Sequence, residues 1–310
     1  MSVTVERPPA VEKAPPPRAR RAHRPQYQWP ARLFVSPALL LCAVLLYLPF
    51  LYTCYLSLTD YNGLGDPTWA GFAKFSAMFT DPSFTHSLLN TLYWVVGTLV
   101  LPVGGGLLVA TLVHDLKHST WYRLPFLIPY ALSGVAVGVI WIFILQTGGA
   151  LDQLCHALGW AHPPRWLIDS PLNTFSMIVA SSWQQVGVNV LLFTVGLQSI
   201  PKEPLEAARV DGASGWTMFR RMTWPMLTPI TTVVVGLSLV ASLKQFDVIY
   251  AMTQGGPGRK SETLALTMYR DSFINNDYGL GAAIAVFLTL VTVSAAMLYL
   301  RRQLSDAKEM

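Results

Sequence analysis

Apolar residues gather in six long runs along the chain, at about residues 33–56, 88–114, 124–146, 176–198, 227–252 and 281–300. Each run is close to the roughly 20 residues that a helix needs to cross the hydrocarbon core of a bilayer. The fifth run is the least regular, because Lys244 and Asp247 interrupt it. The pattern predicts an all-α integral membrane protein with six transmembrane helices.

The residues before the first run have a different composition. Segment 1–30 is rich in Pro, Ala and Arg and lacks the apolar side chains that a core requires, so we expect a disordered basic tail. The first run is long enough to span and has no obvious small-residue cleavage site, which argues against a cleaved signal peptide. Basic residues also attract anionic lipid headgroups, although a topology signal alone explains the tail. Residues 31–310 are expected to form one six-helix membrane domain.

Positive charges are distributed unevenly between the segments that flank the runs. The tail, the segments after the second and fourth runs, and the C-terminal piece carry 16 Lys and Arg residues, against five in the other three segments. Because Lys and Arg favour the cytoplasmic side, both termini and residues 199–226 are expected in the cytoplasm, with the chain crossing the cell membrane several times. An even number of spans agrees with this orientation.

The composition supports a membrane protein over a soluble one. Hydrophobic residues make up 52% of the chain and charged residues only 13%, whereas soluble domains carry about a quarter charged residues. The mean hydropathy is +0.41. Three cysteines are too few for a disulfide framework, and we expect them to be small apolar packing residues.

The polar segment between the fourth and fifth runs has the signals of a helical hairpin. Pro204 suits a helix start, where its missing N–H costs nothing. Asp211 and Gly212 predict a turn in which glycine adopts a positive φ. A second helix is expected over about 213–222, with an apolar face formed by Trp216, Phe219 and Met222. From the pattern alone, an amphipathic helix lying on the lipid is an alternative.

The sequence EAARVDGA within this segment closely resembles the EAA motif of permease subunits of bacterial ABC importers. In that family the hairpin carries the coupling helix, which docks into a groove of a cytoplasmic ATPase. The matching positions are Glu206, Ala207, Ala208, Asp211, Gly212, Ala213, Phe219 and Pro225. The resemblance implies that these residues couple the chain to the ATPase.

The resemblance covers most of the chain outside the tail. The motifs SLTDYNG, DPSF, NTLYW and FDVIYAMTQGGPG look like those of carbohydrate-type permeases, and YGLGAAIAVFL resembles the MalF-like branch. Permeases of this branch carry oligosaccharides, sugars or glycerol 3-phosphate. The larger periplasmic insertion of maltose-type permeases is absent, because the segment 57–87 is short.

The family implies several partners for the chain. It would form half of the translocation pathway with a second, similar permease subunit, and work with two cytoplasmic ATPases and an extracytoplasmic sugar-binding protein. ATP and Mg²⁺ are expected on the ATPases, and this chain is expected to bind no cofactor, metal or nucleic acid and to catalyse no reaction. The segment GGPGRKS (255–261) does not match a P-loop, because Arg259 stands where the motif needs glycine.

Polar residues inside the apolar runs are candidates for the substrate path, since intramembrane polar groups often face a cavity. Gln185 and Asn189 are four apart in the fourth run and would share a face. We expect them to form a cavity wall with Asp247, with Gln184 flanking it or packing elsewhere and Lys244 pairing with Asp247. Asn90 and Tyr250 are further candidates. Polar contacts between helices are an equally good explanation for these amides.

Two other features predict no chemistry of their own, and two rival protein classes lack the features they need. His114 and His118 have a spacing that binds metal on a helix, but no third ligand stands nearby. The sequence GVAVG (134–138) has the G-x-x-x-G spacing that permits close helix packing. A self-sufficient secondary transporter would need inverted repeats and an ion site, and a membrane enzyme would need a nucleophile or metal set; neither is evident.

Overall fold

The computed structural model describes residues 28–309 and divides the chain into two units, Met1–Pro49 and Phe50–Met310. In the first unit, the described residues form α1 (Gln28–Cys42) and the π-helical turn η1 (Ala43–Tyr47), and the chain then enters α2 (Leu48–Leu56). Residues 1–27 lie outside the described part, so the disordered tail stays a prediction there. Residues 28–30 belong to α1 rather than to the tail.

The second unit contains a short ribbon of two antiparallel strands, in which Thr59 pairs with Trp69. All its other regular elements are helical. The elements before the hairpin are β1 (Thr59–Asp60), β2 (Thr68–Trp69), α3 (Ala73–Thr80), α4 (Pro82–Thr98), η2 (Leu99–Val103), α5 (Gly104–Val113), α6 (Ser119–Tyr130), α7 (Gly134–Leu145), α8 (Ala150–Ala157) and α9 (Leu172–Gln198). The remaining elements are α10 (Lys202–Val210), α11 (Gly215–Met218), η3 (Phe219–Thr223), α12 (Trp224–Met226), α13 (Thr228–Leu243), α14 (Asp247–Met252), α15 (Leu264–Phe273) and α16 (Tyr278–Glu309).

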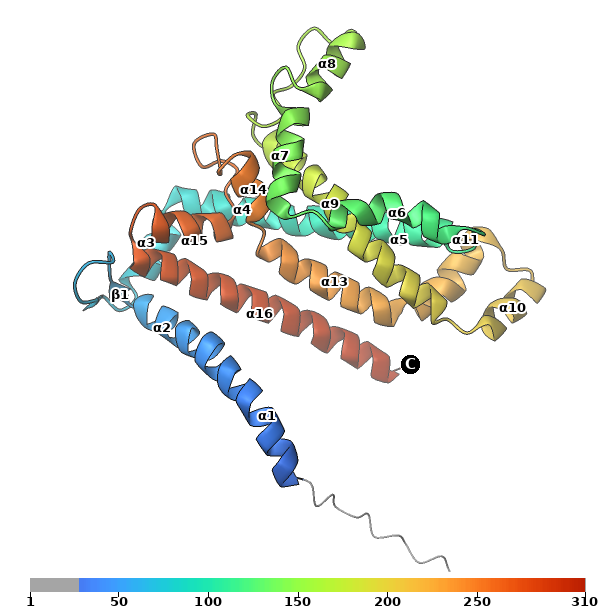
Figure 1. The fold of residues 1–310 in the computed structure, drawn as a ribbon, viewed down its shortest axis with the longest axis horizontal. Helices are drawn as coiled ribbons and strands as arrows, with labels where there is room; N and C mark the ends of the chain where they lie inside the picture. Colours follow the sequence, from blue (N-terminus) through green and yellow to red (C-terminus); the bar gives the residue numbers. More distant parts are fainter. Residues whose placement is uncertain (1–27, 310) are drawn as a thin grey trace, which may run out of the picture. The chain divides into compact units, whose positions relative to one another are not determined.

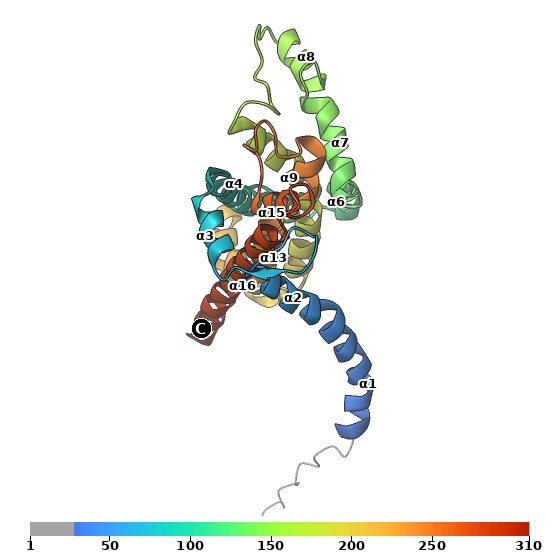
Figure 2. The same cartoon turned by 90° about the vertical axis from the view of Figure 1, so that its left-hand side faces the viewer.

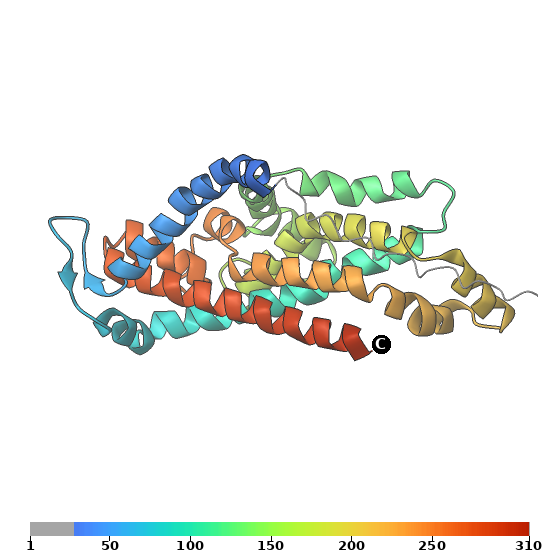
Figure 3. The same ribbon diagram turned by 90° about the horizontal axis from the view of Figure 1, so that it is seen from below.

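Long helices run side by side through the second unit. Helix α13 packs against α4 and α16, and α9 packs against α5 and α6 (Figure 1). Helix α7 packs against α14 and α9, and α8 lies beyond it, away from the other helices of this unit (Figure 2). The hairpin helices α10 and α11 lie at one end of the unit, and β1, β2 and α3 lie at the other (Figure 3). We call these the hairpin end and the ribbon end.

Three apolar clusters hold the second unit together. The first joins α4, α7, α9, α14 and α15 around the fully buried Trp94. The second joins α5, α9 and α13 around Phe193, and the third joins α3, α15 and α16 around Leu264. Each cluster combines helices that are distant in the sequence. Because the first cluster shares α9 with the second and α15 with the third, the three clusters hold the helices of this unit together.

Four of the six predicted spans are confirmed as long apolar helices. The structure forms them at Arg32–Leu56, Pro82–Val113, Leu172–Gln198 and Tyr278–Arg301. The second begins six residues before the predicted run because Asp81 caps it: its Oδ1 accepts a hydrogen bond from the Ser83 amide at 2.8 Å. Pro82, the first residue of α4, then occupies a position where no N–H is needed.

The third and fifth runs are broken, so predicting each as a single helix was wrong. The third turns at residues 131–133, where Ser133 Oγ accepts a hydrogen bond from the Ala136 amide at 3.2 Å and starts α7. The long apolar segment in this region is instead Gly134–Ala157. The fifth run ends its first helix at Leu243, and Thr228–Leu243 forms a 72° bend with Gly215–Met226. Among the described residues, five helices can cross a membrane, or six if this bent pair is one span.

Candidate functional site

The predicted turn of the hairpin is confirmed and has the geometry of a Schellman motif. The Ala213 amide donates to the Ala208 carbonyl at 2.9 Å, and the Gly212 amide donates to the Arg209 carbonyl at 3.1 Å. Gly212 has a φ of +85°, and a Cβ at this position would meet no atom within 4 Å. The glycine is therefore needed for its backbone conformation, which satisfies the last carbonyls of α10, and not for space.

The second arm of the hairpin is longer than predicted. It continues from α11 through η3 to α12 at Met226, and its aromatic side chains contact one another. The rings of Trp216 and Phe219 stack with centroids 5.4 Å apart, and Phe219 also contacts Trp224 at 6.2 Å. These contacts stiffen the arm that leads from the turn into α13.

The predicted coupling residues form an open surface on the hairpin. No residue of α10 is buried, and Val210 beside the turn is 88% exposed. The exposed members of the motif are Glu206, Ala207, Asp211, Gly212 and Pro225, and the half-buried ones are Ala208, Ala213 and Phe219. Helix α10 thus leaves its motif residues free to contact another molecule.

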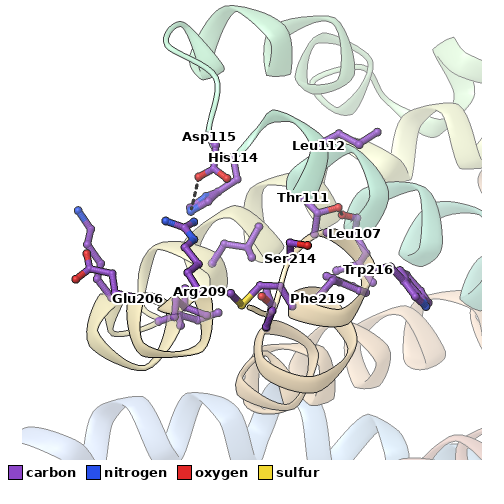
Figure 4. Close-up of a pocket in the computed structure, with 18 of the residues that line it drawn as sticks. Leu107, Thr111, Leu112, His114, Asp115, Glu206, Arg209, Ser214, Trp216 and Phe219 are labelled. Carbon is purple, nitrogen blue, oxygen red and sulfur yellow. Dashed lines mark hydrogen bonds and ion pairs between the residues drawn. The ribbon is translucent and has the colours of Figure 1, made fainter. Parts of the chain in front are cut away.

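A cavity of about 1460 Å³ lies between the hairpin and the ends of α5 and α9. Figure 4 shows Arg209 pointing toward the turn that carries His114 and Asp115, while Phe219 lines the opposite wall. His114 Nε2 lies 3.9 Å from Asp115 Oδ1. Because α5 ends at Val113, His114 does not share a helix with His118, and the helical spacing predicted for this pair does not form.

The break in the fifth run separates two of the predicted substrate-path residues. Lys244 follows the last residue of α13, Asp247 starts α14, and both side chains are exposed. No ion pair joins them, so the predicted pairing was wrong, because the helix that would place them on one face is interrupted. Asp247 instead lies beside the start of α7, where a Cβ on Gly134 would be 3.3 Å from a carboxylate oxygen of Asp247.

A second predicted substrate-path residue reaches the same turn between α6 and α7. Gln184 Nε2 donates to the carbonyl of Leu132 at 2.6 Å. Gln184 from α9 and Asp247 from α14 therefore both approach residues 132–134. The spacing of Gly134 and Gly138 also serves close packing as predicted, since a Cβ on Gly138 would be 2.6 Å from the Ala251 Cβ.

Asn189, predicted to form a wall with Gln185 and Asp247, lies in a contact between helices. Asn189 is 3% exposed and lies against α5, where a Cβ on Gly106 would be 2.4 Å from the Asn189 Cβ. Gln185 Nε2 donates to Ser181 Oγ at 2.6 Å, one turn earlier on the same helix. The glycine on α5 admits Asn189 into a helix contact, which sequence spacing within α9 does not reveal. Contact of these residues with a substrate stays a prediction.

Tyr250 belongs to an aromatic cluster beside the break. Its ring stacks on Phe246 with centroids 5.3 Å apart and meets Tyr269 edge-on at 5.6 Å. All three rings are half-buried. The cluster packs α14 against α15 and leaves aromatic surface partly open next to the break.

Sequence reasoning missed a buried charge at the ribbon end. Glu262 is fully buried, with Arg259 Nε 3.0 Å from one carboxylate oxygen and the Arg270 guanidinium paired with the other. Asn90, predicted to face a cavity, instead donates its amide to the carbonyls of Lys260 and Glu262. The only signal in the sequence is the concentration of charges after the glycine-rich segment.

The comparisons with known proteins agree with this geometry. The family model for binding-protein-dependent transport system inner membrane components matches residues 102–305. A probable ABC transporter permease protein of Pyrococcus horikoshii is 34% identical over 277 residues, covering 86% of this chain and 93% of the relative. A probable starch degradation products transport system permease protein of Thermoanaerobacterium thermosulfurigenes is 30% identical over 275 residues, covering 87% and 93%.

Solved structures share the fold. A chain of a bacterial ABC transporter involved in the import of the acidic polysaccharide alginate matches with a TM-score of 0.77 and 20% identity, covering 89% of this chain and 95% of that one. The predicted family resemblance is confirmed. The chain belongs to the family of inner membrane components of binding-protein-dependent transport systems, and it is a membrane permease subunit of an ABC importer.

Proposed function

We propose that this permease subunit forms half of a path for a neutral oligosaccharide or sugar. A relative is named for starch degradation products. The basic side chains near the break between α13 and α14 also favour a neutral substrate over a phosphorylated one. Near the break, Arg259 and Arg270 are already paired with Glu262, so the exposed Lys244 offers one basic side chain where phosphate recognition generally uses several. A phosphorylated polyol such as glycerol 3-phosphate is therefore the second candidate.

The hairpin end is proposed to face the cytoplasm and dock with an ATPase. The observation that carries this proposal is the exposed EAA segment on α10, held by a glycine C-cap. The segments 115–123 and 199–226, which carry two and four Lys and Arg residues, both lie at this end, which supports a cytoplasmic orientation under the positive-inside rule (Figure 3). The ribbon end would then face an extracytoplasmic sugar-binding protein, and a second permease subunit would complete the path.

Transport would follow alternating access driven by the ATPases. Their closure on ATP would move the hairpin, whose second arm leads through a 72° bend into α13. The far end of α13 is the break at residues 244–246. A displacement of the hairpin is thus transmitted along one helix to the region where Gln184, Asp247 and Tyr250 lie. ATP and Mg²⁺ would be bound by the partner ATPases, which supply the hydrolysis.

The test is uptake by the complete importer reconstituted in vesicles with its binding protein. We expect ATP-dependent, vanadate-sensitive accumulation of labelled neutral oligosaccharides such as maltotriose, and weaker uptake of glycerol 3-phosphate. A preference for glycerol 3-phosphate would reject the neutral-sugar assignment alone. Uptake by this chain without ATPases, driven by an ion gradient, would instead identify a secondary transporter.

A further inference from the structure

The break between α13 and α14 needs partners for its backbone. Non-helical backbone at membrane depth is tolerated only where protein or a water-filled cavity satisfies its polar groups. The amides of Lys244 and Gln245 donate to carbonyls of the preceding turn at 3.2 and 3.3 Å. The Gln245 carbonyl, however, accepts a hydrogen bond from Thr263 Oγ1 at 2.8 Å. This bond ties the break to a segment 18 residues further along the chain.

Thr263 stands at a helix start, where a threonine side chain ordinarily bonds within its own helix and not to a distant carbonyl. It is fully buried and is the N-cap residue of α15, yet its side chain makes no capping hydrogen bond. A threonine at an N-cap ordinarily accepts a bond from an amide of the first helical turn. Here the hydroxyl donates to the break instead, so the sequence forgoes a local stabilisation of α15 to fix the backbone at Gln245.

The residue before Thr263 is anchored from several sides. The Glu262 carboxylate pairs with Arg259 and Arg270 and accepts a hydrogen bond from Thr267 Oγ1 at 3.0 Å. Its carbonyl accepts from the Asn90 amide of α4 at 2.9 Å. Displacement of this buried carboxylate is strongly disfavoured, because it would leave charged groups unpaired.

Two further contacts fix the segment that carries Glu262 and Thr263. The Leu264 amide donates to Thr91 Oγ1 of α4 at 3.0 Å. Gly255, with a φ of +85°, makes room for the Glu262 side chain, since a Cβ there would be 2.3 Å from the Glu262 Cγ. Thr263 therefore projects from a segment held against α4 and α15.

We propose that Glu262 and Thr263 are positioning residues for the substrate path. Glu262, held by its two arginines, sets the orientation of Thr263, and the Thr263 hydroxyl pins the break at Gln245. This inference rests on the proposed function, in which the break borders the path. Motion that enters α13 from the hairpin then meets a fixed point at the far end of the helix, so it changes the geometry of the break and does not slide the whole span.

The direct test compares Thr263→Val with Thr289→Val by hydrogen exchange of the intact importer in nanodiscs. Valine keeps the shape of threonine and removes the hydroxyl. Thr289 is the matched control, because its Oγ1 bonds only to the Ala285 carbonyl of its own helix. We expect Thr263→Val to speed amide exchange over residues 244–253 about fivefold, which corresponds to about 1 kcal/mol for one hydrogen bond, and Thr289→Val to leave it unchanged.

Glu262 is tested through its dependence on Thr263. Glu262→Gln should speed amide exchange at residues 244–253. It should cause no further increase there in a protein that already carries Thr263→Val. Glu262→Asp, which keeps the charge, should speed this exchange less than Glu262→Gln does. If Glu262→Gln does not assemble, Glu262→Asp replaces it in the same comparison. The proposal is overturned if Thr263→Val leaves the break unchanged, if it speeds exchange equally in α13 and α16, or if the Glu262 and Thr263 effects add.

Transport separates this proposal from the proposed function. Importers that carry Thr263→Val should assemble normally and bind the external binding protein with unchanged affinity, but their maximal rate of uptake should be lower than that of the wild type. A wild-type importer that fails to move sugars would reject the function while leaving the exchange result intact. Faster exchange at the break with an unaltered uptake rate would reject the positioning role.

Discussion

Gly212 offers the sharpest perturbation of the hairpin, because its replacement changes the backbone energy and little else. Its φ is +85° and a Cβ would meet nothing within 4 Å, so no clash contributes. Placing an L-residue in this left-handed conformation costs about 1–2 kcal/mol. If only the native hairpin binds the ATPase and its alternatives lie close to it in free energy, this cost lowers the affinity by up to about 5- to 30-fold, at tenfold per 1.4 kcal/mol.

The assay measures ATPase affinity for purified permease complexes that carry Gly212→Asn, Gly212→Ala or Gly212→Val. We expect affinity to fall in that order, because asparagine tolerates the left-handed region and a β-branched residue disfavours it most. Gly65→Val is the matched control at the ribbon end, since Gly65 has a φ of +72° and equally open surroundings. Wild-type affinity for Gly212→Val, or an equal loss for Gly65→Val, would refute the reasoning.

Three further predictions concern the membrane region and the ribbon end. Gln184→Leu should lower the unfolding free energy by about 1 kcal/mol through loss of its bond to the α6–α7 turn, while the exposed Gln198→Leu should not, as thermal unfolding would show. Asn189→Leu should impair assembly before transport, because the site is tightly packed against α5; normal complex yield with reduced uptake would return Asn189 to the substrate path. Burial raises the pKa of Asp271 above the ordinary carboxyl range, so the protein loses stability as pH rises from that ordinary range through the raised pKa, and the stability gained from Asp271→Asn should grow over the same interval. A pH-independent difference would contradict this last account.

The hairpin was predictable because its signals are local. Pro204 near the helix start and Gly212 after its end are read directly from the sequence, and both helices form around them. The same holds for Asp81 and the proline after it, which cap the second span, although hydropathy alone placed that start six residues late.

The breaks in the third and fifth runs were not predictable from hydropathy, because apolar residues continue across both. Ser133 caps a new helix as a single polar residue in an otherwise apolar window. In the fifth run Lys244 and Asp247 mark an irregular position, but apolar residues resume after them, and hydropathy does not tell a break from a charged span. The roles of Asn189 and Glu262 depend on partners remote in the sequence, at Gly106 and Asn90 respectively. Spacing within one helix carries no information about such partners.

Docking of the hairpin end with a cytoplasmic ATPase is tested most directly by crosslinking. A photo-crosslinking residue at Val210, 88% exposed beside the hairpin turn, tests it in the assembled importer, with Trp69, 70% exposed at the ribbon end, as the comparison. We predict that position 210 crosslinks to the ATPase subunit and that position 69 does not. Crosslinking of the ATPase to position 69, or of the external binding protein to position 210, would contradict the account.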